Sequence, residues 1–200
     1  MKKSLFFALF MVISSVSQAQ IYPQGSINVS AGYGVVSYGN AALKLFEKTL
    51  DLKNLKSNLT GPLYFKGEYA VADNFTIGLN LNYGKTSATF TIDSAGFAGK
   101  YQGTLGLRST SGIVRANYTI PFAEDRAGFM IGGGLGYRGF RISYADNKPE
   151  TPVDGGVPLS GFLTFEITMG LRYYFTENIG FYVETGITRS LLQGGITARF

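Results

Sequence analysis

Apolar and polar residues alternate over many short stretches of the chain. From Ile27 to Val35, every odd position is Ile, Val, Ala or Tyr, and every even position is Asn, Ser or Gly. Successive side chains of a β-strand point to opposite faces, so this pattern predicts a strand with one apolar face. The pattern recurs seven more times, with apolar faces along Leu63–Val71, Phe75–Tyr83, Val114–Ile120, Phe129–Tyr137, Leu163–Tyr173, Phe181–Ile187 and Leu192–Phe200.

Eight strands with this alternation predict an all-β fold, an antiparallel up-and-down barrel that closes on itself. A soluble barrel alternates in the same way, so alternation alone does not tell which face meets water. The bulky aromatic residues favour a transmembrane barrel, because many of them fall at one end of their strands, as at a bilayer interface. These residues are Tyr118, Phe122, Phe129, Tyr173, Phe175, Phe181 and Phe200.

The connections between the predicted strands alternate in length. Three are short and polar, at 72–74, 123–126 and 176–178. The connections at the other end are long, about 37–61, 86–104 and 144–160, apart from a very short one around Arg189. Short periplasmic turns and longer outer loops are the arrangement of outer-membrane barrels.

The N-terminus is predicted to be a secretory signal peptide, residues 1–19, followed by the barrel, residues 20–200. Lys2 and Lys3 precede an apolar run that is too short to span a bilayer as a helix, and Ser17 and Ala19 place small residues before a cut after Ala19. Without the two lysines the formal charge of +5 falls to +3, with no basic run, so nucleic acid is not expected as a partner.

The composition excludes several kinds of chemistry. The chain has no Cys and no His, which removes disulfides, Cys-ligated zinc, and catalysis by Ser-His-Asp or Cys-His groups. Gly134–Gly139 matches GxGxxG but lies in a predicted strand with no helix after it, so it does not indicate a dinucleotide site. We therefore expect no enzyme activity, no cofactor and no metal.

The last strand, Gln193–Phe200, ends on a C-terminal aromatic residue. With the eight alternating segments, it makes residues 25–200 resemble the small outer-membrane barrels of Gram-negative bacteria, of the OmpA transmembrane domain and OmpX type. That resemblance implies a place in the bacterial outer membrane, contact with its lipid, and recognition of Phe200 by the barrel-assembly machinery. Barrel enzymes of related kinds carry an essential His that this chain lacks.

Charged residues lie on the faces opposite the apolar ones, and the barrel places them in the lumen. An eight-stranded barrel is just wide enough for side chains to fill it, so we expect a plug rather than a pore. Pairing Phe175 with Phe181 across the 176–178 turn predicts Arg172 opposite Glu184. The expected network consists of Lys66, Glu68, Arg115, Glu166, Arg172, Glu184 and Arg199.

The apolar positions change phase towards the outer ends of three strands. If these strands continue above the bilayer, the change turns apolar side chains inwards. Two interpretations stay open: an extension with its own small core or with bulges, and an apolar mouth pocket for a lipid or another hydrophobic ligand. The residues concerned are Phe90, Ile92, Leu105, Leu107, Phe140 and Ile142.

The loop 40–59 contains Leu43, Phe46 and Leu50 at helical spacing, which predicts a short amphipathic helix. Two functions remain for the whole chain. One is a non-enzymatic barrel that serves envelope structure or contacts a surface partner through its outer loops. The alternative is a binder or transporter of small hydrophobic solutes or lipids.

Overall fold

The computed structural model describes residues 20–37, 56–93, 100–123, 126–146, 154–187 and 190–200. The predicted signal peptide and the core of the predicted loop helix lie outside these ranges. The described part contains eight strands: β1 (Ile27–Ser37), β2 (Lys56–Ala72), β3 (Phe75–Asp93), β4 (Lys100–Phe122), β5 (Ala127–Asp146), β6 (Asp154–Tyr174), β7 (Ile179–Ile187) and β8 (Ser190–Arg199).

The strands form a closed barrel in sequence order, with every neighbouring pair antiparallel. β1 pairs with β8 from Asn28↔Arg199 to Ser37↔Ser190, which closes the ring. The all-β, eight-stranded, up-and-down barrel predicted from the alternation is therefore confirmed. Within the described ranges no helix is long and apolar enough to cross a membrane.

The outer ends of the strands differ from the prediction, because several strands run deep into the expected loops. β3 continues to Asp93, β4 begins at Lys100, and β5 and β6 meet at Asp146 and Asp154. β3 pairs with β4 without interruption from Phe75↔Tyr118 to Asp93↔Lys100. The expected loop ranges 86–104 and 144–160 are thus largely strand.

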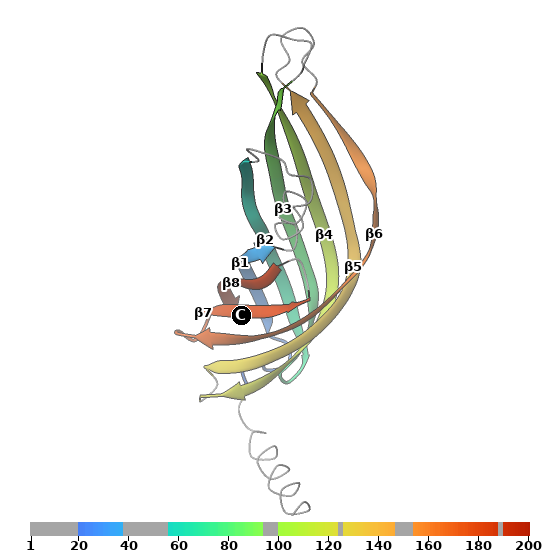
Figure 1. Cartoon of the computed structure of the whole chain (residues 1–200). Helices are drawn as coiled ribbons and strands as arrows, with labels where there is room; N and C mark the ends of the chain where they lie inside the picture. The colour runs from blue at the N-terminus through green and yellow to red at the C-terminus, as the bar shows by residue number, and fades with distance from the viewer. Residues whose placement is uncertain (1–19, 38–55, 94–99, 124–125, 147–153, 188–189) are drawn as a thin grey trace, which may run out of the picture.

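The barrel is consequently much taller on one side than on the other (Figure 1). The pairing of β6 with β7 extends from the turn end of the barrel up to Ile167↔Ile187, and that of β1 with β2 extends up to Tyr33↔Leu63. Above those levels β2–β6 continue as an open sheet, whose two edges pair with no other strand among the described residues. We call this open sheet the projecting wall.

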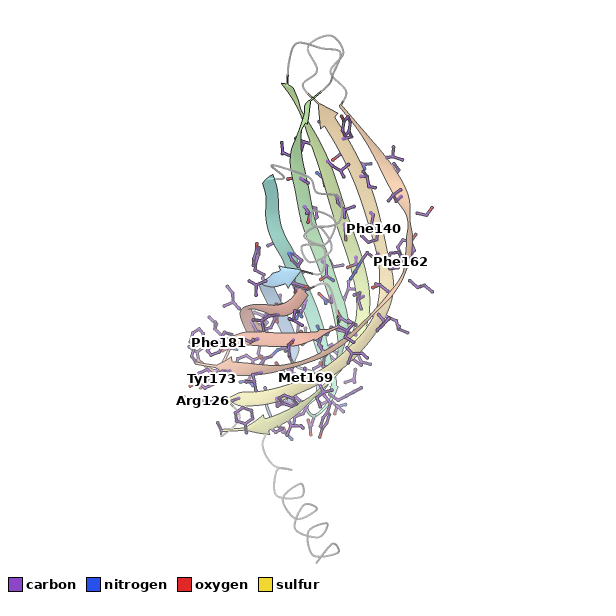
Figure 2. The ribbon with its side chains drawn as sticks, in the orientation of Figure 1. Arg126, Phe140, Phe162, Met169, Tyr173 and Phe181 are labelled. Carbon is purple, nitrogen blue, oxygen red and sulfur yellow. The ribbon has the colours of Figure 1, made fainter. Side chains whose placement is uncertain are left out.

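The outer surface of the ring is apolar and its interior is charged. Leu135 and Leu163 on the outside are 74% and 86% exposed, whereas Lys66 and Glu184 inside are 0% exposed. This is the reverse of a soluble barrel and is the distribution that a bilayer requires. The rings of Tyr173 and Phe181 pack together at the turn end at a tilt of 41°, with centroids 5.5 Å apart (Figure 2).

The turn end of the barrel is closed by the segment before β1. Ile21 and Tyr22 are buried, and both of their backbone N–H groups donate to Asn74 Oδ1, at 3.0 and 3.3 Å. Asn74 lies in the β2–β3 turn with a positive φ of 59°, a conformation that Asn tolerates better than most residues. The Tyr22 hydroxyl lies 2.8 Å from that of Tyr174 on β6.

Candidate functional site

Six charged side chains meet in the centre of the lumen, and all six are buried. They project from alternate positions of β2, β4, β6 and β7, where the small or apolar residues between them face outwards. Three cations face three carboxylates, so the cluster has no net charge. We call this set the lumen network: Lys66, Glu68, Arg115, Glu166, Arg172 and Glu184.

Glu184 has more charged neighbours than any other carboxylate of the lumen network. Its Oε2 atom lies 2.7 Å from Lys66 Nζ and 3.4 Å from Arg115 Nη1. The side chain of Gln193 donates to the same oxygen at 2.8 Å. The Lys66 ammonium also lies 4.3 Å from the centre of the Tyr182 ring. These contacts compensate the desolvation of the two charges, without which burial would be very costly.

Arg115 crosses the lumen and links the three carboxylates. Its guanidinium nitrogens lie 3.7 Å from Glu68 Oε1 and 3.5 Å from Glu166 Oε1, in addition to its contact with Glu184. Asn117 Oδ1 accepts hydrogen bonds from Arg115 Nε and Nη2, at 3.0 and 2.7 Å. The Asn117 amide in turn donates to Glu68 Oε1 at 2.9 Å. The guanidinium is therefore held in one orientation.

The predicted opposition of Arg172 and Glu184 is wrong. β6 and β7 pair as Tyr173↔Phe181, so Arg172 faces Tyr182 and Glu184 faces Gly170. Arg172 Nη1 instead binds Glu68 Oε2 at 2.8 Å, and its other contact, with Glu184 Oε1, is 3.9 Å. The cause is the turn, where the N–H groups of Phe175 and Thr176 both donate to the Ile179 carbonyl.

Arg199 was expected in the same network but lies apart from it, at the turn end. Its guanidinium donates to the carbonyl of Ile21, and to that of Glu177 at 2.7 Å. It also stacks 4.6 Å from the centre of the Tyr174 ring. Arg199 thus fastens the N-terminal segment to the end of the barrel.

Four further residues of the lumen are not among those predicted from the sequence. The tyrosines Tyr64, Tyr174 and Tyr182 are buried among the ion pairs, and Arg138 is half-buried above them. All four occupy inward positions of the same alternation that identified the charges, so the signal was present in the sequence. Ile21 and Tyr22 carry no such signal, because they precede the first strand.

The outer half of the site is an apolar surface on the lumen side of the projecting wall. The β3–β4 and β4–β5 registers show no shift in this region, so the strands keep their phase and the apolar residues face inwards. A shift between Arg138 and Phe140 brings residues of β6 onto the same face. We call this surface the inner apolar face: Leu105, Leu107, Phe140, Ile142, Val157 and Leu159.

The inner apolar face remains partly open to solvent. Leu107 and Ile142 are each 36% exposed, and Val157 is 65% exposed. Within this face the ring of Phe140 stacks on that of Phe162 from β6, with centroids 5.5 Å apart (Figure 2). Phe90 and Ile92, which were predicted for the same surface, belong to β3, but their side chains fall outside the described part.

The buried acidic side chains of the described ranges are held in structural contacts. No group of three or more acidic residues is placed to hold a metal ion within the described ranges. The buried carboxylates contact cations or amide donors rather than an open cleft. The lumen network can fill and fix the barrel, while the projecting wall offers two faces for binding.

Solved structures with a similar fold are bacterial outer-membrane barrels. The outer membrane protein OprG of Pseudomonas aeruginosa has a TM-score of 0.51 and 11% identity, covering 92% of this chain and 99% of that one. The N-terminal β-barrel domain of OprF of the same organism has a TM-score of 0.45 and 14% identity, covering 90% and 100%. Ail of Yersinia pestis, solved with a heparin analogue, has a TM-score of 0.40 and 12% identity, covering 88% and 99%.

No curated protein matches the chain. A family model does match it: the outer membrane protein beta-barrel domain fits residues 6–196, nearly the whole length. The match agrees with the closed ring of eight strands, the apolar outer wall and the charged lumen. The chain therefore belongs to the family of outer membrane protein β-barrel domains.

Proposed function

We propose that this protein is a closed, non-enzymatic barrel of the bacterial outer membrane, which serves envelope structure or contacts a partner at the cell surface. The observation that carries the proposal is the charge-neutral network that fills the lumen. Lys66, Arg115 and Arg172 are each within 4 Å of a carboxylate, and their side chains are at most 1% exposed. An interior of this width has no room for both these side chains and a water-filled path.

The projecting wall supports the surface role. β3, β4 and β5 continue well beyond the ring formed with β7, β8 and β1. The part of these strands beyond the bilayer buries no further charged residues of the lumen network. Contacts made outside the membrane therefore explain the extension better than packing of the lumen does. In this proposal the outer loops and the wall together form the interaction surface.

Conductance measurements test the closed lumen. The purified protein in planar lipid bilayers should give no stepwise current, in contrast to a wide porin measured alongside it. Arg172→Ala should lower stability by roughly 3–5 kcal/mol, because it leaves Glu68 without its nearest cation. The same variant should still give no current, since the other ion pairs continue to fill the lumen.

Arg126→Ala is the matched control, because the Arg126 side chain is exposed at the turn end and the hydrogen bonds of this residue are made by its backbone, to the Ala123 carbonyl and from the Tyr174 N–H. Its unfolding temperature and its lack of current should equal those of the wild type. A large, reproducible ion current through the wild-type protein would refute the proposal.

A second function, reception of a small hydrophobic solute at the mouth, is favoured by the inner apolar face. Large apolar side chains that face the axis above the ring remain at least one-third exposed at Leu107, Ile142 and Val157, and this exposure is unfavourable in water. A solute with an alkyl chain would cover them. The exposed residues Leu107 and Ile142 pair directly across β4 and β5 and form the centre of that surface.

Photolabelling distinguishes this second function from simple contact with lipid. A diazirine-bearing fatty alcohol should label the upper parts of β4–β6 in the wild-type protein held in lipid nanodiscs. Ile142→Asn should abolish that labelling, whereas Thr110→Asn, a change at an exposed position on the outer face, should leave it intact. Labelling confined to the lipid-facing wall at 129–137 would exclude the second function.

A further inference from the structure

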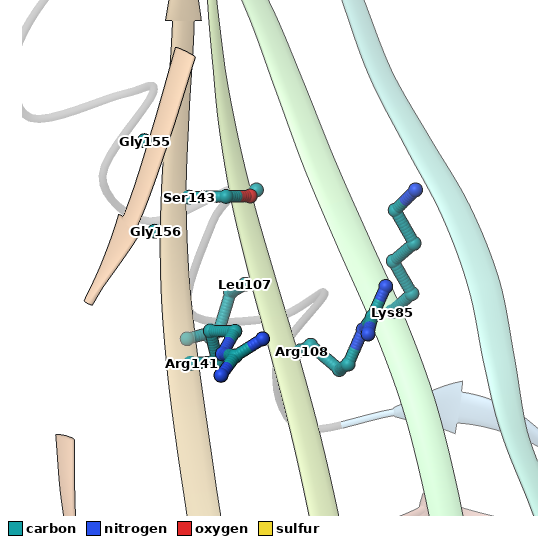
Figure 3. A pocket seen from close by; sticks show the side chains of 8 residues that line it. Lys85, Leu107, Arg108, Arg141, Ser143, Gly155 and Gly156 are labelled. Atoms are coloured by element: carbon teal, nitrogen blue, oxygen red, sulfur yellow. The ribbon is translucent and has the colours of Figure 1, made fainter. Parts of the chain in front are cut away.

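Three basic residues lie side by side on the outer face of the barrel. Lys85 on β3 pairs with Arg108 on β4, and Arg108 pairs with Arg141 on β5. All three are exposed, and each has the same phase as the outward-facing residues of its own strand. We call them the basic row; Figure 3 shows them on three neighbouring strands.

The basic row lies directly above the apolar outer wall. Lys85 follows Tyr83, the last large apolar residue on the outside of β3, by two positions, or about 7 Å along the strand. The Arg108 guanidinium lies 5.9 Å from the centre of the Tyr83 ring. Tyrosines mark the level of the bilayer interface. The basic row is therefore at headgroup height, at the end of the barrel away from the short turns.

The charges of the basic row are uncompensated within the described part of the chain. The ion pairs there all belong to the lumen network. Adjacent strands are only about 4.8 Å apart, and like charges that face each other across strands destabilise a sheet. A row of three adjacent positive charges is stabilised when an anion binds against it.

A shallow hollow beside the basic row provides space for that anion. The next outward row above it is Ser87, Gly106, Ser143 and Gly156, so only two small serine side chains project there. Lys85, Arg108 and Arg141 line the hollow together with Gly106, Ser143 and Gly156 (Figure 3). Guanidinium groups bind phosphate oxygens in pairs, with charge-assisted hydrogen bonds.

We propose that the basic row binds the phosphate groups of the phosphorylated glycolipid in the outer leaflet, while the acyl chains of that lipid lie along the apolar wall below. The position of the basic row favours a lipid over a soluble anion, because the row adjoins Tyr83 and the apolar wall rather than the mouth of the barrel. The site is on the opposite face of the projecting wall from the inner apolar face. It is therefore independent of the lumen and of either proposed function.

To test this proposal, the full protein in detergent micelles is titrated with diphosphoryl lipid A, and native mass spectrometry measures the fraction of protein that carries the lipid. Lys85→Gln/Arg108→Gln/Arg141→Gln should weaken binding roughly tenfold or more, because even one lost charge-assisted hydrogen bond removes about one power of ten. Dephosphorylated lipid A should bind the wild type as weakly as diphosphoryl lipid A binds this triple variant. Arg126→Gln, which removes an exposed cation at the turn end, should change nothing.

A second variant keeps the test decisive if the triple variant folds poorly. Arg108→Lys/Arg141→Lys preserves every charge but loses the paired geometry of the guanidinium, so it should bind with intermediate strength. Equal binding of diphosphoryl lipid A by all variants would overturn the proposal. So would a wild-type protein that binds inorganic pyrophosphate or a heparin oligosaccharide in preference to diphosphoryl lipid A.

Discussion

At the scale of single residues, Gly132 shows how the lumen network depends on residues that carry no charge. Gly132 lies on the inward face of β5, directly opposite Asn117 on β4. A Cβ atom at this position would collide with Asn117 Oδ1, the atom that orients Arg115. The absence of a side chain therefore leaves room for the Asn117 amide that orients the guanidinium.

Gly132→Ala should destabilise the protein by about 1–3 kcal/mol, the usual cost of overpacking a filled core. Gly139→Ala on the same strand is the matched control, because a Cβ there meets only Thr110 Oγ1, at an ordinary 3.8 Å. Urea unfolding of the refolded proteins, followed by their heat-modifiable mobility in gels, measures both. Equal midpoints for the two variants would show that Gly132 is not required for the packing of the lumen.

At the scale of strands, the alternation of side chains predicts which residues face the lumen but not which residues pair. The error at Arg172 is a slip of two residues between β6 and β7. A two-residue slip leaves every side chain on its original face, so the hydrophobic pattern cannot detect it. The turn sets the register, because the N–H groups of Phe175 and Thr176 donate hydrogen bonds to the Ile179 carbonyl. The alternation of apolar and polar residues does not predict these hydrogen bonds.

The ends of the strands were harder to predict than their centres for a different reason. The change of phase at Leu107 and Phe140 correctly predicts that apolar residues face inwards at the outer ends of these strands. The prediction that the same ranges are loops is wrong, because they are largely strand. The N-terminal segment had no periodic signal at all. Its position depends on contacts with distant residues, above all Asn74 and Arg199.

At the scale of the whole molecule, the structure divides into a closed ring and an open wall. The six charged residues of the lumen network all lie within the ring, at or below the level of Tyr83↔Thr110. Within the described ranges the edges of the wall on β2 and β6 pair with no further strand, because β1 and β7 end far below it. Stability should therefore come mainly from the ring, and surface contacts mainly from the wall.

Removal of the upper wall tests this division. Residues 87–106 and 143–156 would each be replaced by Asn-Gly, which joins the paired residues Thr86 with Leu107 and Ile142 with Val157 by two-residue hairpin turns. The shortened protein should refold, and its unfolding temperature should stay within roughly 4 °C of the wild type, the shift that about 1 kcal/mol produces at this size. It retains the lumen network, so it should still block current. Failure to refold would mean that the ring cannot form without the wall, and that the strands above the bilayer belong to the core of the fold.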